Sequence, residues 1–205
     1  TYGFAHLWMM PRFSALQNLI PERELRMVTS DSRTIFDLAE VDFALRFGRG
    51  DWRDAQSQKL FGEELFPVCS AAFAQRHFGG CDAVQPGAIA RAPLIHERAE
   101  KHSWLSWSQW LARHGVEYQP AENAHYFDNY AMTLQAATEG QGVALAWPHF
   151  VEAPLRSGQL VELRGLRIRT DAGYYLAYRR GDAMADRIVN WFRKMAGEQQ
   201  AGASV

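Results

Sequence analysis

Residues 41–52 read VDFALRFGRGDW, an apolar run followed by a loop with two glycines, and this stretch decides the fold class. The apolar run, Phe43 to Phe47, is predicted to be a strand, and the loop after it carries charge and an aromatic ring. Many ligand sites of α/β proteins lie in such a loop at the end of a strand. The ligand of this loop could be a phosphate, a nucleic acid or a small acid, or the loop could bind nothing. The rest of the sequence has to decide among these alternatives.

The composition is that of a folded protein without an overall attraction for polyanions. The 205 residues suffice for one large domain or two small lobes, and the hydrophobic content of 47% excludes disorder as the main state. Lys and Arg number 22 against 23 Asp and Glu, which gives a formal net charge of -1. Contacts with nucleic acid would therefore have to be made by another part of the protein.

Cysteines and apolar runs point to an intracellular chain. Cys69 and Cys81 are not spaced as a zinc ribbon or as a disulfide framework, so two reduced thiols are expected. No apolar run is long enough to cross a bilayer, and no basic-then-apolar leader opens the sequence. The chain starts at TYGFAHLWMMPRF without a methionine, so we expect that an N-terminal portion is missing.

Helical and extended patterns alternate along the chain and predict a parallel α/β sheet, with a second lobe that starts after residue 69. The predicted helices cover residues 4–18 (with Pro11 inside), 34–40, 71–77, 86–90, 104–114, 130–139 and 184–195. The predicted strands cover residues 25–29, 43–47, 93–96, 124–127, 143–147 and 174–179, with two extended pieces in 59–69 that join near Gly62. Asp128 is the predicted N-cap of the helix over 130–139.

Short motifs give no catalytic or metal site. The segment Gly48 to Arg53 has an arginine where a dinucleotide fingerprint needs its third glycine, and Gly140 to Gly142 lies after a helix, the wrong end of such a unit. His96 to Glu100 has a glutamate in place of the second histidine of a zinc motif. There is no nucleophile elbow and no phosphate loop, so no cofactor and no metal are expected.

The tryptophans of SWLSWSQWL, residues 103–111, allow two interpretations. Such rings can stack on the bases of single-stranded nucleic acid, but that use needs flanking basic residues, and the charges nearby are mixed. Packing of a helix into the core explains most of them. Trp104, at the start of the predicted helix, is left open as a ligand contact.

Three segments together resemble a known family. They are residues 2–52, with DFALRFGRGDW at 42–52; residues 60–73, LFGEELFPVCSAAF; and residues 127–163, which begin FDNYAMTLQAATEGQGVAL. This pattern resembles the effector-binding domain of LysR-type transcriptional regulators, in the branch of the glycine-cleavage activator and the β-lactamase-inducing regulator. The resemblance covers nearly the whole chain.

The resemblance implies an α/β fold like that of type 2 periplasmic binding proteins, with two α/β lobes joined by two crossing strands and an effector in the cleft between them. Residues 1–68 and 171–205 would form regulatory lobe I, and residues 69–170 regulatory lobe II. The winged helix-turn-helix and linker helix of the family would precede Thr1. DNA would then be bound only through that absent N-terminal part.

The resemblance also implies which residues line the effector cleft. From lobe I these are the start of the first helix, the turn after residue 28 and the end of the strand at 43–47: Tyr2, Gly3, Phe4, Ala5, Thr29, Ser30, Asp31, Arg46 and Phe47. From lobe II they are His96, Trp104, Phe127, Asp128, Asn129 and Trp147. Many relatives carry a small hydroxyl residue where Phe4 and Ala5 stand, which favours a more apolar or aromatic effector.

Each of these residues also has a purely structural interpretation. Arg46 can pair with Asp31 or Asp42, Asp128 can be only a helix cap, and Trp147 can belong to the core. For the opening stretch, the resemblance implies that Arg46 and Phe47 face the cleft, while residues 48–52 form a surface loop.

The predicted function is a cytoplasmic, non-enzymatic sensor domain of a transcriptional regulator. It would bind an unidentified small-molecule effector, associate into a homodimer or tetramer and make no membrane contact. The alternative is a periplasmic solute-binding protein for an amino acid or small organic ion, which would have a signal peptide upstream of Thr1. An enzyme on the same scaffold is the third class, for which the residue spacing shows no nucleophile or base.

Overall fold

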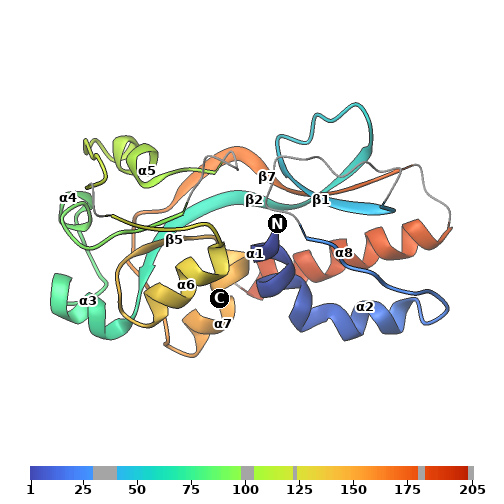
Figure 1. The fold of residues 1–205 in the computed structure, drawn as a ribbon, viewed down its shortest axis with the longest axis horizontal. Helices are drawn as coiled ribbons and strands as arrows, with labels where there is room; N and C mark the ends of the chain where they lie inside the picture. Colours follow the sequence, from blue (N-terminus) through green and yellow to red (C-terminus); the bar gives the residue numbers. More distant parts are fainter. Residues whose placement is uncertain (30–40, 98–103, 122–123, 180–182, 203–205) are drawn as a thin grey trace. The chain divides into compact units, whose positions relative to one another are not determined.

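A computed structural model describes residues 1–29, 41–97, 104–121, 124–179 and 183–202 (Figure 1). The chain divides into two compact units: unit 1 is Thr1–Glu63 with Arg169–Val205, and unit 2 is Glu64–Ile168. The first boundary lies inside strand β2 (Gln56–Cys69), and the second lies at the start of strand β7 (Ile168–Tyr178). The chain therefore passes from one unit to the other within strands.

Unit 1 begins with a helical run of changing pitch. It consists of α1 (Tyr2–Phe4), the π-helical η1 (Ala5–Met9), the 3-10 helix η2 (Met10–Arg12) and α2 (Phe13–Leu19). Pro11 has no N–H to donate, so the regular α-helical hydrogen-bond ladder cannot continue through it. The run packs against the last helix, α8 (Ala183–Gly202), as the blue and red helices of Figure 1 show.

The core of unit 1 is aromatic. Phe4 and Trp8 lie four residues apart on one helical face and are both fully buried. Trp8 stacks on Phe192 of α8 with ring centroids 5.7 Å apart, and Phe4 packs on Tyr174 of β7 at 5.2 Å. The Trp8 indole N–H donates to Oε1 of Gln199 at 2.7 Å, so the one polar atom of this large ring is satisfied.

The first strand of unit 1 pairs antiparallel, which corrects the predicted parallel sheet for this part. Strand β1 (Phe43–Gly48) runs against β7, with Phe43 opposite Tyr178 and Gly48 opposite Gly173. The partner of β1 comes from the far end of the chain, so the local order of helices and strands does not determine the direction of pairing. The predicted strand over 25–29 is also wrong: described residues 24–29 contain no strand.

The loop after β1 packs against Tyr175, and this packing requires a glycine at position 50. Gly50 has φ +83°, and a Cβ built there would lie 2.5 Å from Cε1 of Tyr175, so only glycine fits this position. Trp52 packs edge-on against the same Tyr175 ring at 5.4 Å, and the Tyr175 hydroxyl donates to the Arg49 carbonyl at 3.1 Å. The glycines and the aromatic residue of the opening motif thus have a structural use within unit 1.

Unit 2 is a mixed α/β unit. Its helices are α3 (Ala71–Phe78), α4 (Pro86–Ile89), α5 (Trp107–Arg113), α6 (Tyr130–Thr138) and α7 (Pro148–Arg156). Its strands are β3 (Ile95–Glu97), β4 (His125–Phe127), β5 (Ala144–Ala146) and β6 (Val161–Glu162). Strands β5 and β6 pair antiparallel with β2, while β3 and β4 are parallel, as expected for strands joined through a helix.

Several predicted element boundaries need correction. Strand β2 is continuous through Gly62, where two pieces were expected. Helix α5 starts at Trp107 rather than Trp104, because Ser106 and Gln109 form a capping box there. The N-cap of α6 is Asn129, whose side chain accepts from the Ala131 N–H at 2.9 Å, and not Asp128. The helix predicted over 34–40 lies outside the described residues.

Candidate functional site

Unit 2 contains a cavity of about 490 Å³ whose described walls come from β3, α5 and the segments on either side of it, β4, α6, and β5 with the residue after it. A volume of this order suits a small organic molecule. Its lining combines aromatic and aliphatic side chains with three serine or threonine hydroxyls, two tyrosine hydroxyls and one carboxylate: Ile95, His96, Glu97, Trp104, Leu105, Ser106, Trp107, Ser108, Pro120, Tyr126, Tyr130, Thr133, Leu145 and Trp147.

Three rings form a contiguous aromatic wall. Trp104 meets Trp147 with centroids 5.1 Å apart and Tyr130 at 6.0 Å, and Tyr130 meets Trp147 at 4.9 Å; all three contacts are edge-on. Each of these residues is at most 5% exposed. Edge-to-face packing fixes the ring planes, so the wall has a defined shape before any ligand arrives.

Hydrogen bonds to the backbone hold the wall in place. The Tyr130 hydroxyl donates to the Leu145 carbonyl at 3.3 Å and accepts from the Trp147 N–H at 3.4 Å, which links α6 to β5. The Trp107 indole N–H donates to the Ile95 carbonyl at 2.9 Å, which ties α5 to β3. Four separate elements are thereby fixed around one space.

His96 is an uncharged member of the lining at neutral pH. It is 5% exposed on β3, and its burial lowers the pKa of the imidazole below the ordinary value. Its Nε2 lies 3.0 Å from the Tyr118 hydroxyl, and its ring packs on Tyr126 of β4 with centroids 4.9 Å apart. A buried neutral imidazole adds a planar, polarisable surface without adding charge.

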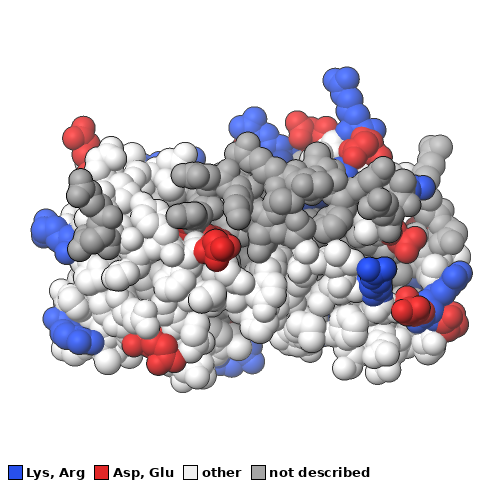
Figure 2. All heavy atoms as spheres, in the orientation of Figure 1, with Lys and Arg blue, Asp and Glu red and all other residues white. Residues whose placement is uncertain are grey.

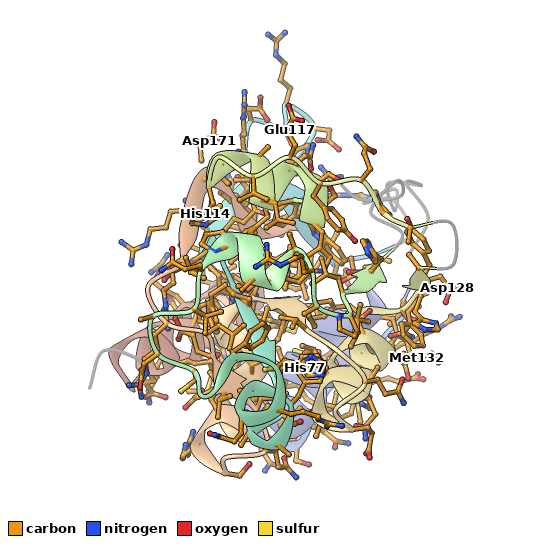
Figure 3. All side chains as sticks on the ribbon, turned by 90° about the vertical axis from the view of Figure 1, so that its left-hand side faces the viewer. His77, His114, Glu117, Asp128, Met132 and Asp171 are labelled. Carbon is orange, nitrogen blue, oxygen red and sulfur yellow. The ribbon has the colours of Figure 1, made fainter. Side chains whose placement is uncertain are left out.

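The structure brings together three of the residues predicted for lobe II, namely His96, Trp104 and Trp147. Phe127, Asp128 and Asn129 follow Tyr126 directly but are not among the cavity lining. Asp128 is exposed, and Figure 3 shows it at the periphery on the same side as Met132. Asn129 acts as a helix cap, which is a structural use of its side chain.

The residues predicted for lobe I lie in unit 1 in differing environments. Tyr2 is 40% exposed and stacks on His6, while Gly3, Phe4 and Ala5 are buried at the start of the helical run. Phe47 packs edge-on against Tyr174 with centroids 5.0 Å apart. Thr29 is exposed, and Ser30 and Asp31 lie outside the described residues.

Arg46 has a defined partner in unit 1. Its two terminal nitrogens donate to the two carboxylate oxygens of Asp54 at 2.9 and 2.8 Å, and its guanidinium lies over the Trp52 ring at 5.6 Å. This hydrogen bonding by Arg46 lowers the pKa of the Asp54 carboxyl below its ordinary value. The predicted structural partners were Asp31 and Asp42; the observed one is Asp54, eight residues along the chain.

The cavity residues that sequence reasoning missed are mainly those assigned to the core. Tyr130 and Trp107 follow helical periodicity and are as buried as core residues, so periodicity alone does not separate them from a ligand wall. Tyr126 directly precedes the predicted Phe127 on strand β4, and its 47% exposure is visible only in the structure.

Charges in the described residues are paired or scattered. Figure 2 shows basic and acidic side chains next to each other on a face that is otherwise uncharged, and Arg49 pairs with Asp171 at 2.9 Å. Among the described residues no group of three His, Cys, Asp or Glu side chains is arranged to hold a metal ion. No helix in the described part of the chain has the length and apolar character needed to cross a membrane.

Comparisons with known proteins agree with the resemblance in the sequence. The glycine cleavage system transcriptional activator of Escherichia coli (strain K12) is 32% identical over 159 residues, which are 78% of this chain and 50% of that protein. The HTH-type transcriptional activator AmpR of Rhodobacter capsulatus is 26% identical over 95% of this chain and 63% of that protein. The chain thus spans between half and two thirds of the length of these relatives.

Solved structures support the same fold. The effector domain of the transcriptional regulator AmpR of Pseudomonas aeruginosa matches with a TM-score of 0.76 at 25% identity, over 99% of this chain and 95% of that chain. The AmpR effector binding domain from Citrobacter freundii matches with a TM-score of 0.72 at 23% identity, over 96% of this chain and 94% of that chain. These matches confirm the predicted type 2 periplasmic-binding-protein-like fold.

The family assignment rests on nearly the full length of the chain. The sequence profile described as LysR substrate binding domain matches residues 1–201. The chain belongs to the LysR substrate binding domain family.

Proposed function

We propose that this chain is the sensing part of a cytoplasmic transcriptional regulator, in which a small-molecule effector controls DNA binding by a segment outside the chain. The observation that carries the proposal is the family match over residues 1–201. The relatives named above are transcriptional activators, and neither is named as an enzyme or a transport protein.

We further propose that units 1 and 2 are the two regulatory lobes and that the effector binds between them. From unit 1, Tyr2, Gly3, Thr29, Ser30, Asp31 and Phe47 would contact it, with Phe4, Ala5 and Arg46 supporting that wall. From unit 2, His96, Trp104 and Trp147 would contact it, together with Phe127, Asp128 and Asn129. The cavity in unit 2 supports this assignment, because it is a preformed space with aromatic walls that core packing does not fill.

The mechanism follows from a two-state equilibrium. An effector that touches both units binds one arrangement of them more tightly than another, and it shifts the population by that difference in affinity. The shift would reposition DNA-binding segments within a homodimer or tetramer. No bond in the effector needs to break, and we propose that the domain is not catalytic.

The test uses the full-length gene product and this 205-residue chain side by side. Each is incubated with fragmented genomic DNA, and the retained fragments are sequenced. We expect the full-length protein to retain a small set of specific fragments and the chain alone to retain none, because its net charge is close to zero. If the full-length protein retains no specific fragment, or its gene begins with a secretion signal, the proposal is wrong.

A further inference from the structure

The two segments that connect units 1 and 2 run side by side up to the boundary between the units. Strands β2 and β7 are hydrogen-bonded neighbours in the sheet. Gly173 of β7 lies against Phe61 of β2, and Thr170 of β7 contacts Glu63 of β2. The partners on β7 fall in number from 173 to 170 as β2 advances from 61 to 63, so the two strands are antiparallel here.

On the unit 1 side of the boundary, a hydrogen bond between side chains links the two strands. The Thr170 hydroxyl donates to Oε2 of Glu63 at 2.5 Å, and it accepts from the Ala172 N–H at 3.1 Å. Glu63 is 3% exposed, so this bond is shielded from water and is stronger than a bond at the surface. We call the Glu63–Thr170 pair the unit 1 clamp.

On the unit 2 side of the boundary, Arg167 binds two carboxylates at once. Its Nε and Nη2 donate to the two oxygens of Glu162 at 2.8 and 2.5 Å, and its Nη1 donates to Oε1 of Glu64 on β2 at 2.8 Å. The guanidinium also lies over the Phe66 ring, with Cζ 4.3 Å from the ring centroid. Charge-assisted contacts of this forked kind fix geometry as well as distance. We call Arg167 with Glu64 and Glu162 the unit 2 clamp.

The two clamps flank a very short piece of chain. On β2 they are separated by the single peptide bond between Glu63 and Glu64, whose side chains point to opposite faces of the strand. On the other segment only residues 168 and 169 lie between the clamps. The division of the chain into two units falls at the same two places, after Glu63 and after Ile168.

Links of this kind act against sliding and separation of the two segments, and much less against bending. Sliding one segment past the other by a single residue is a displacement of about 3.3 Å, which no hydrogen bond tolerates, so it would break both clamps. A change of φ and ψ at the residues between the clamps leaves both clamps intact. Domain movements divide into hinge and shear types on this criterion.

We propose that the two clamps restrict the relative movement of units 1 and 2 to a hinge at residues 63–64 and 168–169. The hinge would serve the proposed sensing function, on which this inference rests, because an effector shifts only an equilibrium between arrangements that the connecting segments permit. The clamps keep the number of those arrangements small.

The distance between two nitroxide labels, one on each unit, measures this restriction. Arg76→Cys on α3 and Lys194→Cys on α8 place the labels at exposed positions of units 2 and 1. Cys81→Ser removes the half-buried native thiol. Cys69 should stay unlabelled, because it is buried and burial raises its pKa to about 12. Double electron–electron resonance on this chain then gives the distribution of distances between the labels.

Two conservative substitutions each remove one clamp. Thr170→Val deletes the hydroxyl and keeps the shape of the side chain, and Arg167→Lys keeps the charge but loses the fork that binds two carboxylates. Each should broaden the distance distribution by roughly 1.5-fold to twofold, because more residues are then free to move. The matched controls are Thr138→Val, whose hydroxyl is bonded within α6, and Arg164→Lys, whose carboxylate partner is in unit 2; both should leave the width unchanged.

Thermal unfolding of the same variants separates a hinge from a merely structural role. Clamp variants that lower Tm but leave the width of the distribution unchanged would overturn the proposal, as would controls that broaden it equally. If one clamp variant does not fold, the other decides. The proposed function has its own readout, the retention of genomic fragments by the full-length protein. Specific DNA binding with unchanged widths refutes the hinge alone, and broadened widths without specific DNA binding refute the proposed function alone.

Discussion

The hydrogen bond from the Trp8 indole N–H to Gln199 joins the first helical run of unit 1 to the last helix through a fully buried ring. Replacing Gln199 by Leu leaves that N–H buried without its acceptor, which should lower the free energy of unfolding by about 1–3 kcal/mol. Urea denaturation measures this change. In the double variant Trp8→Phe with Gln199→Leu the losses should be less than additive. Full additivity would show that the bond does not stabilise the fold.

His149, buried in α7, makes stability depend on pH. Burial lowers the pKa of His149 to about 3, whereas an unfolded chain has its histidine pKa near 6.5. As the pH falls below the unfolded value, the unfolded chain binds a proton that the folded chain does not, so the free energy of unfolding decreases. From about pH 6.5 to pH 5 the loss from this one group is about 2 kcal/mol.

Urea titrations at both pH values, with His149→Gln as the comparison, measure the contribution of His149. The variant should retain only the smaller pH dependence of other histidines, such as the buried His96 and the half-buried His114, whose pKa values are lowered in the same direction. An unchanged pH dependence in the variant would contradict the assignment to His149.

Single residues also show which parts of the candidate site can be predicted from the sequence and which cannot. Resemblance pointed to His96, Trp104 and Trp147, which line the cavity. It did not single out Tyr130, because a residue on a helical stripe has the same pattern whether it packs in a core or walls a cavity. For Arg46 the predicted partners were carboxylates near in sequence or in the expected fold, and the observed Asp54 depends on how the loop after β1 turns back.

At the scale of elements, capping decides where α6 begins. Asp128 and Asn129 are adjacent polar residues of cap-forming type, so the sequence favours neither strongly, and only the hydrogen bond from Ala131 identifies Asn129. Asn129→Ala should destabilise the chain by about 1 kcal/mol, while Asp128→Ala should change stability by a few tenths at most. Thermal unfolding of the two variants distinguishes them. Equal effects would mean that capping is shared.

Two glycines provide opposite tests of element packing. A Cβ at Gly173 of β7 would lie 2.2 Å from the Phe61 carbonyl oxygen, so Gly173→Ala must displace backbone and should cost about 1–3 kcal/mol. Gly197 is exposed inside α8 with open space around its Cα, so Gly197→Ala should stabilise by about 0.5–1 kcal/mol. Chemical denaturation of both variants checks the signs. A tolerated Gly173→Ala would contradict the close approach of β2 and β7.

Most helices were predictable as elements because their apolar stripes and stop signals are local. The helix predicted over 71–77 is observed as α3, where Ser70 caps the start and Gly79 ends the helix in a left-handed conformation. Pairing directions were not predictable in the same way. The antiparallel pairing of β1 with β7 joins residues more than a hundred positions apart, and no local pattern encodes it.

At the scale of the whole molecule, the family and fold were the most predictable features, because the diagnostic segments extend over nearly the full chain. The arrangement of the aromatic side chains around the cavity required the structure. The tryptophans of SWLSWSQWL are divided between two roles: Trp107 and Trp104 line the cavity, whereas Trp110 is fully buried and is not part of the lining.

The most direct test of the sensing function is the thermal unfolding of this chain, titrated with the ultrafiltered small-molecule fraction of extracts from the organism that makes it. A ligand of the folded state at a hundred times its Kd adds about 2.7 kcal/mol of stability, which is a rise in Tm of roughly 5–10 °C for a domain of this size. We expect such a rise with extract from at least one growth condition. The rise should grow with the logarithm of the extract concentration, and Tyr126→Leu should reduce it. A Tm that no extract changes would contradict the claim that this chain is a sensor of small molecules.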